Sequence, residues 1–311
     1  MSNPENKNKQ PLLLIAGPTA SGKTASALQL AKTHKISIIN ADSAQVYDGM
    51  PILSAQPSRE EMASAPHHLF GYLPPYEYCS AARWANDAKR ELQKIWDKDR
   101  LPILVGGTGL YMRTLLDGIS PVPAIDANVR HMVRQLDVTA AYAQLCHEDP
   151  IRAKQLNPND DARIKRSLEV VLSTQRSLLS WQQEKSGGIL ENVDLEAHIL
   201  LPDRNWLYER CDRRFDQMID LGAIDEVKML ISHKLPHDAP AARAIGVKEI
   251  SAFLAQEINK EEMLNLGKIA TRQYAKRQFT WFRNQSPPSW NRVELNSKLS
   301  FNNEIISKFE I

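Results

Sequence analysis

The sequence is poor in cysteine and has no long apolar run. Its three cysteines, Cys79, Cys146 and Cys211, lie far apart, and no two of them form a C-x-x-C pair. This spacing argues against a disulfide framework and against structural zinc, and it is typical of a reduced, cytoplasmic protein. No apolar stretch approaches the length of about 20 residues that a membrane-spanning helix needs. We therefore expect no membrane partner.

An excess of charge of one sign is also missing. The chain has 39 lysines and arginines against 37 acidic residues, a formal net charge of +2. Any surface for a polyanion must therefore be local. Residues 1–10 are polar and have no apolar segment, so we expect a flexible leader there and no signal peptide. The 311 residues are enough for one large domain or two moderate ones.

What is present is a glycine-rich motif close to the amino end. It follows an apolar run at 12–16 and precedes a helix-favouring segment at 25–32, which is the strand, turn and helix context of a phosphate-binding loop. We call it the phosphate loop. It consists of Gly17, Pro18, Thr19, Ala20, Ser21, Gly22, Lys23 and Thr24.

This loop predicts a site for a di- or triphosphate group. Its backbone N–H groups would surround the anion at the positive end of a helix. Lys23 would reach the terminal phosphate oxygens, and the Thr24 hydroxyl would ligate Mg²⁺. The competing interpretation is a lysine on a solvated helix start. The motif does not say whether the bound group is ATP.

Polar residues follow two further apolar runs. Asp42 and Ser43 come after the run at 36–39, and Thr108 comes after the run at 102–105. Because ligands of open parallel sheets bind beyond the carboxyl ends of the strands, these side chains should face the phosphate loop. Asp42 would ligate Mg²⁺ through water or accept a proton, or it would only cap a turn. No apolar run ends in aspartate, which argues against an ATPase. The adjacent His67 and His68 are expected in a loop.

The middle of the chain predicts only helices, and an apolar run at 197–201 then returns as a fourth strand. The fold class is therefore α/β, a P-loop NTPase-like parallel sheet flanked by helices, with an all-helical insertion. We expect the core at 11–120 and 197–311 and the insertion at 121–196. A helix expected to begin at Ala162 carries Arg163, Lys165 and Arg166 in its first turn, where they oppose the helix dipole. Either a phosphate backbone docks there or the turn is simply solvated.

The segment 270–292 has no acidic residue and interleaves basic with aromatic residues. Such a pattern suits single-stranded nucleic acid, because cations bind phosphates and rings stack on bases. The aromatic side chains are more readily explained as core residues. The residues concerned are Arg272, Tyr274, Lys276, Arg277, Phe279, Trp281, Phe282, Arg283 and Arg292.

Taken together, the motifs resemble those of the bacterial tRNA dimethylallyltransferases over about residues 11–283. The likeness rests on the phosphate loop and on the sequences at 42–47 (DSAQVY), 66–69 (PHHL), 106–111 (GGTGLY) and 271–283 (TRQYAKRQFTWFR). The family usually has Gly-Thr-Ala-Lys-Pro where this chain has Leu-Ser-Ala-Gln-Pro at 53–57, and often tyrosine at Val247.

The resemblance implies transfer of a dimethylallyl group from dimethylallyl diphosphate to N6 of the adenosine 3′-adjacent to the anticodon. The phosphate loop, with Mg²⁺, would hold the diphosphate of the donor. Asp42 would be the general base, Thr108 would position the substrate, and Arg214 with Lys23 would stabilise the leaving diphosphate. The implied tRNA contacts are Asp42, Ser43, Ala44, Gln45, Thr108, Arg130, Ala162, Arg163, Ile164, Lys165 and Arg166. We expect a monomer.

Two other functions share part of this pattern. An adenylate isopentenyltransferase of the cytokinin-forming kind would need the phosphate loop and the aspartate but no insertion that binds tRNA. A P-loop small-molecule kinase, or a nucleotide-binding module without chemistry, would need the loop alone. The basic residues of the insertion favour the tRNA enzyme.

Overall fold

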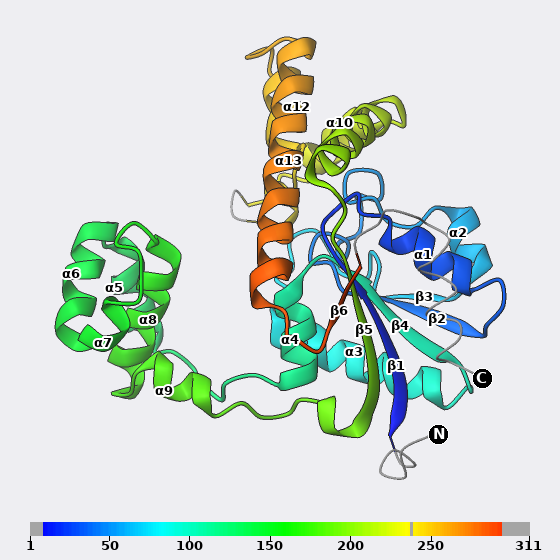
Figure 1. Cartoon of the computed structure of the whole chain (residues 1–311). Helices are drawn as coiled ribbons and strands as arrows, with labels where there is room; N and C mark the ends of the chain where they lie inside the picture. Colours follow the sequence, from blue (N-terminus) through cyan, green and yellow to red (C-terminus); the bar gives the residue numbers. More distant parts are fainter. Residues whose placement is uncertain (1–8, 237–238, 294–311) are drawn as a thin grey trace. The chain divides into compact units, whose positions relative to one another are not determined.

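Short apolar runs form the centre of a parallel sheet in the computed structural model, which describes residues 9–236 and 239–293 (Figure 1). The strand order is β3-β2-β4-β1-β5-β6. The strands are β1 (Gln10–Ala16), β2 (Ile36–Asn40), β3 (His67–His68), β4 (Leu101–Gly106), β5 (Val193–Leu200) and β6 (Asn291–Val293). All pairings are parallel, so the expected fold class is confirmed.

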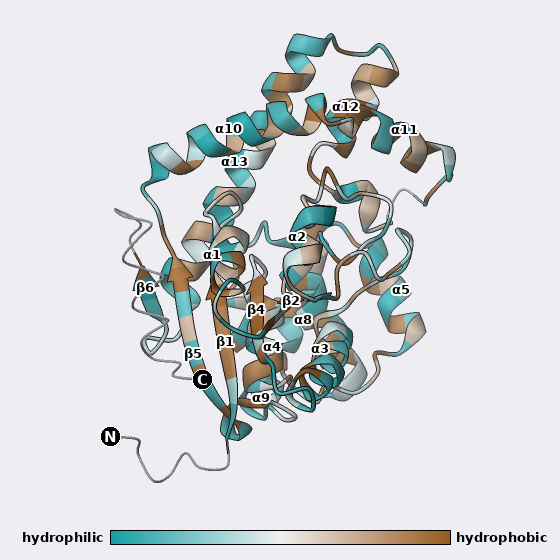
Figure 2. Cartoon of the chain, turned by 90° about the vertical axis from the view of Figure 1, so that its right-hand side faces the viewer, coloured by the Kyte–Doolittle hydropathy of each residue, from teal (hydrophilic) through white to brown (hydrophobic). Residues whose placement is uncertain are grey.

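Helices cover the sheet because its central strands are apolar on both faces. Residues 12–16 and 103–104 have no exposed surface, and Figure 2 shows β1 and β4 as hydrophobic throughout most of their length. α1 (Lys23–Leu30) packs on β1 and β4, and α3 (Ala81–Trp96) packs on β2 and β4. The other amino-terminal helices are α2 (Arg59–Ser64) and α4 (Gly109–Asp117).

Two long helices of the carboxyl-terminal part pack on each other. They are α10 (Arg204–Asp220) and α13 (Lys260–Gln285), joined by the ion pairs Arg272–Asp212 at 2.6 Å and Lys268–Asp216 at 2.7 Å. α11 (Ala223–Ser232) and α12 (Val247–Leu254) connect them. Asp203 caps α10, because its side chain accepts hydrogen bonds from the N–H groups of Asn205 and Trp206 in the first turn.

The chain divides into two compact units. Unit 1 comprises the sheet and its helices, and unit 2 is residues Leu116–Ile189. The helices of unit 2 are α5 (Ala127–Gln135), α6 (Val138–Glu148), α7 (Pro150–Ala153), α8 (Asp161–Thr174) and α9 (Leu178–Gln183). Their core contains Val133, Leu145, Ile164 and Leu168, which are fully buried.

Several expected boundaries were wrong. His67 and His68 form the short edge strand β3 beside β2, because both backbones pair with residues 38 and 39, so they do not lie in a loop. β5 begins at Val193, before the apolar run at 197, since its first residues pair with the start of β1. Gln10 already belongs to β1, and the rest of the expected leader, up to residue 8, lies outside the described residues. No helix in the described part of the chain is long and apolar enough to cross a bilayer.

Candidate active site

The sheet register places three loops at one edge. Ala16 pairs with Gly106, and Asn40 pairs with Val105, so β1, β2 and β4 end at the same level. The loops that follow bond to one another, with Thr108 N–H donating to Ala41 O at 3.1 Å. This approach requires glycine at 106, because a Cβ there would lie 2.1 Å from the oxygen of Ala41.

Asp42 is fixed by the buried Asn40 at the end of β2. The Asn40 side chain accepts from Asp42 N–H at 2.8 Å and donates to Asp42 O at 3.0 Å and to Leu69 O at 2.9 Å. The carboxylate accepts from Ala44 N–H through Oδ1 at 3.0 Å. Its Oδ2 lies toward Gly107, 3.0 Å from where a Cβ of that residue would be. One carboxylate oxygen is thus held by the backbone, and the other is left to meet a ligand.

Basic side chains surround the phosphate loop. Arg210 of α10 donates from Nε to Ala20 O at 2.9 Å, and Arg214 Nη1 donates to Thr19 Oγ1 at 3.3 Å. Lys23 Nζ donates to Pro18 O at 2.7 Å. Arg214 therefore contacts the loop that was expected to hold the diphosphate, and Lys23 is itself part of that loop.

Gln278 of α13 connects two of the loops, and it was not predicted as a site residue. Its Oε1 accepts from Thr19 N–H at 2.7 Å, and its Nε2 donates to Gly107 O at 3.0 Å. A Cβ on Gly107 would lie 2.1 Å from that Nε2, so this contact requires glycine. The sequence does contain a signal for it: Gln278 follows Thr271 and Ala275 on the buried face of α13. A glutamine at such a position needs partners.

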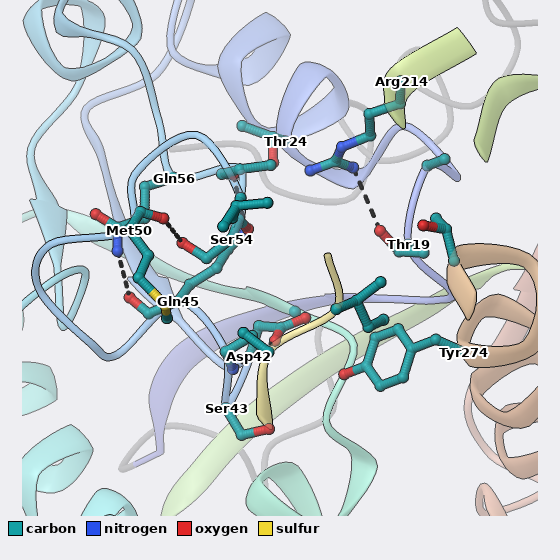
Figure 3. A pocket seen from close by; sticks show the side chains of 18 of the residues that line it. Thr19, Thr24, Asp42, Ser43, Gln45, Met50, Ser54, Gln56, Arg214 and Tyr274 are labelled. Atoms are coloured by element: carbon teal, nitrogen blue, oxygen red, sulfur yellow. Dashed lines mark hydrogen bonds between the residues drawn. The ribbon is translucent and has the colours of Figure 1, made fainter. Parts of the chain in front are cut away.

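These loops and helices enclose a cavity of about 750 Å³ (Figure 3). Thr24, Asp42, Arg214 and Tyr274 all lie around it in that view. Among the residues that the structure describes, its charged lining is five cations, Lys23, Arg210, Arg214, Arg243 and Arg277, against two carboxylates, Asp42 and Glu61. Such a lining is complementary to an anionic ligand.

Burial lowers the pKa of two of these cations and so disfavours their charged form. It lowers the pKa of Lys23 from 10.5 to about 8, although the negative charge of Asp42 acts in the opposite direction. Burial also lowers the pKa of Arg214, again opposed by Asp42. Desolvated cations of this kind gain from an anion placed between them, because the anion replaces the lost water.

Not every expected residue faces the cavity. Thr19, Ala20, Gly22, Lys23 and Thr24 line it, whereas Ser21 is buried and its hydroxyl finds no hydrogen-bond partner among the described residues. Thr108 bonds to Ser43, accepting from Ser43 N–H at 2.9 Å and donating to Ser43 Oγ at 3.2 Å, and its hydroxyl also bonds to the Tyr274 side chain. Its hydroxyl is thus part of the support of the Asp42 loop. Tyr274, expected in the core, lines the cavity.

The donor set around Thr24 fits a magnesium ion only together with a ligand. Among residues 9–236 and 239–293 there is no group of three His, Cys, Asp or Glu side chains able to hold a metal. The oxygen donors lining the cavity include the Thr24 hydroxyl and the Asp42 and Glu61 carboxylates. Mg²⁺ prefers oxygen ligands and commonly binds with substrate phosphates and few protein groups.

In unit 2, the expected basic cluster is paired. Asp160 caps α8 and binds Arg163 at 2.8 Å, while Asp161 binds Lys165 at 2.8 Å. α8 therefore begins one residue earlier than expected, and the acidic residues offset the unfavourable position of the cations. Ile164 is fully buried, so its side chain does not reach the surface. Arg130 and Ala162 are exposed, and the Arg163 side chain is 71% exposed.

Comparison with known proteins assigns the family. The family model described as IPP transferase matches residues 45–285, and a second, described as isopentenyl transferase, matches residues 10–70. A tRNA dimethylallyltransferase from Erythrobacter litoralis is 54% identical over 291 residues, 92% of each chain. One from Zymomonas mobilis is 49% identical over 94% of each chain. The chain belongs to the IPP transferase family.

Solved structures agree with this membership of the IPP transferase family. The full-length tRNA isopentenylpyrophosphate transferase of Bacillus halodurans superposes with a TM-score of 0.69 at 35% identity, covering 96% of this chain and 97% of that one. A eukaryotic dimethylallyltransferase acting on tRNA gives a TM-score of 0.83 at 26% identity, covering 96% of this chain and 80% of that chain. The resemblance drawn from the motifs is thereby confirmed.

Proposed function

We propose that this IPP transferase is a tRNA dimethylallyltransferase, moving a dimethylallyl group from dimethylallyl diphosphate to N6 of the adenosine 3′ to the anticodon. The observation that carries the proposal is the convergence of a carboxylate and a cluster of cations on one cavity. Prenyl transfer needs both, a proton acceptor for the amine and positive charge for the leaving group.

The diphosphate would lie against the phosphate loop. Lys23 and Arg214 would stabilise the negative charge that develops on the diphosphate as it leaves. Mg²⁺, held by Thr24 and the diphosphate oxygens, would neutralise part of that charge. Lys23 would exchange its bond to Pro18 O for the anion, because a charged acceptor binds an ammonium group more strongly than a neutral carbonyl does. The anion would also raise the pKa of Lys23 again and keep it protonated.

Asp42 would accept the proton of the adenine amine. The bond between N6 and C1 of the prenyl group forms while the C1–O bond breaks, and the electron pair of that bond leaves with the diphosphate. The amine proton passes to Asp42 Oδ2. Because the lone pair of the amine is delocalised into the ring, removal of its proton assists the attack, and such assistance is typically worth about 10²–10⁴-fold. The adenine must first leave its stack to reach the cavity.

The geometry of the sheet argues against the kinase alternative. The four longest described strands end at Ala16, Asn40, Gly106 and Leu200, so none of these four carries the terminal aspartate with which many P-loop enzymes position Mg²⁺ and the nucleophile. Arg243 and Arg277 line the cavity and are exposed, so they could bind several phosphates of an RNA substrate, whereas free adenylate offers one.

One assay separates the candidates. The protein is incubated with Mg²⁺, labelled dimethylallyl diphosphate and an unmodified anticodon stem-loop. In parallel reactions, AMP replaces the stem-loop, or labelled ATP replaces dimethylallyl diphosphate. The proposal predicts a prenylated adenosine after digestion of the RNA and no product from AMP. Consumption of ATP with the RNA untouched would establish the kinase, and prenylation of AMP alone would establish the cytokinin-type enzyme.

A further inference from the structure

Tyr274 brings a phenol hydroxyl into the cavity on the side of Asp42. Figure 3 shows its hydroxyl turned toward Asp42 and Ser43, from a helix more than two hundred residues further along the chain. The negative charge of Asp42, followed by burial, raises the pKa of Tyr274 far above its ordinary value of 10.0. The phenol is therefore protonated near neutral pH and can donate a hydrogen bond.

The position of Tyr274 is well fixed. The following turn of α13 holds Gln278, which bonds to both neighbouring loops, and the preceding turn holds Thr271, whose hydroxyl donates to Gly267 O at 2.8 Å. Ala275 is fully buried against α10. The Arg277 guanidinium lies 5.7 Å from the centre of the Tyr274 ring. A side chain held in this way is preorganised for a ligand.

Asp42 and Tyr274 together present one acceptor beside one donor. An ionised carboxylate can only accept, and the protonated phenol can donate. The edge of adenine that carries N6 has the complementary pair, an N–H donor next to an unprotonated ring nitrogen, N1 on one side and N7 on the other. Guanine has an acceptor oxygen in place of the amine, which would face the carboxylate of Asp42 unfavourably.

We propose that Tyr274 donates a hydrogen bond to the ring nitrogen beside the amine and so, with Asp42, selects adenine and aims N6 at the transferred carbon. This inference rests on the proposed prenyl transfer to adenine and adds a residue that sets the choice and orientation of the base. Asp42 alone would hold the amine but leave the ring free to turn about that contact.

The test pairs Tyr274→Phe with base analogues. Anticodon stem-loops carrying adenosine, 1-deazaadenosine or 7-deazaadenosine at the target position are prenylated by the wild type and by the variant, and kcat/KM is measured for each. With adenosine, Tyr274→Phe should lose about tenfold, the usual worth of one such bond. One deaza analogue should cost the wild type a similar factor yet cost the variant nothing further. Which analogue behaves so identifies N1 or N7 as the partner.

Tyr78→Phe is the matched control, since Tyr78 also lines the cavity but on the loop before α3. The loss of kcat/KM caused by Tyr78→Phe should be the same with adenosine and with each analogue, as expected for independent sites. If Tyr274→Phe also loses the same factor in kcat/KM with adenosine and with both analogues, the inference is wrong. A slow variant alone would not support it, because a structural defect does not depend on one ring nitrogen. Absence of transfer to the adenosine stem-loop by the wild type would instead overturn the proposed function.

Discussion

Unit 1 and unit 2 both carry basic side chains, but they hold them differently. In unit 1, Lys23 and Arg214 lie within the cavity and contact the phosphate loop, and burial lowers the pKa of each. In unit 2, Arg163 and Arg166 are exposed and pair with carboxylates of their own helix. Half-buried cations inside a cavity suit one small anion at a fixed place, whereas exposed ones suit an extended, salt-sensitive partner. We expect mutations in the two units to differ accordingly.

The largest effect is expected in the cavity of unit 1, from Asp42→Asn. Asparagine keeps the size of the side chain but cannot take the amine proton. Turnover should fall by about 10²–10⁴-fold, while KM for dimethylallyl diphosphate stays within a small factor. Single-turnover rates at saturating substrates measure the chemical step directly. An unchanged rate would remove Asp42 from the role of base.

The next largest effect is expected from Gln278→Leu, because it removes the hydrogen bonds to the half-buried Thr19 N–H and the buried Gly107 O. Each unpaired group costs about 1–3 kcal/mol, so the free energy of unfolding should drop by about that amount or more. The KM for the donor should rise as the phosphate loop loosens. Gln273→Leu, an exposed position on the same helix, is the control, and equal losses in both variants would refute the connecting role of Gln278.

The titration of Lys23 predicts how the binding of an anion in the cavity depends on pH. Its pKa of about 8 means that the free enzyme loses this charge above pH 8, so inorganic pyrophosphate should bind progressively less tightly there. Arginine at this position keeps its charge. The ratio of the wild-type Kd to that of Lys23→Arg should stay constant below pH 8 and rise about tenfold per unit above it. A ratio that is flat to pH 10 would show that Lys23 does not meet the anion.

In unit 2 the expected effects are smaller and depend on salt. Reversing the charges of Arg163 and Arg166 to glutamate should weaken binding of tRNA and make the logarithmic salt slope shallower by about one to two. Lys154→Glu, an exposed change in the same unit, should leave the slope nearly unchanged. Equal slopes in all three proteins would mean that the start of α8 is only solvated.

The sequence predicted those parts of the site that are local in the chain. The apolar runs located the four long strands, and the rule that ligands bind beyond strand ends brought Asp42 and Lys23 to one edge. It did not predict Gln278 or Tyr274 as site residues, because both lie on α13, and only packing against α10 determines which face of that helix meets the loops. The pairing of Arg163 with Asp160 was likewise missed, since the cap moved the helix start by one residue.

The most direct test of this difference between the two units is the salt dependence of KM for each of the two substrates, measured with the same enzyme. KM for dimethylallyl diphosphate and KM for the anticodon stem-loop are measured between about 50 and 200 mM salt. We predict a steep rise of KM for the stem-loop and a nearly constant KM for the donor, whose cations Lys23 and Arg214 are half-buried in the cavity. Equal slopes for the two substrates would contradict the account.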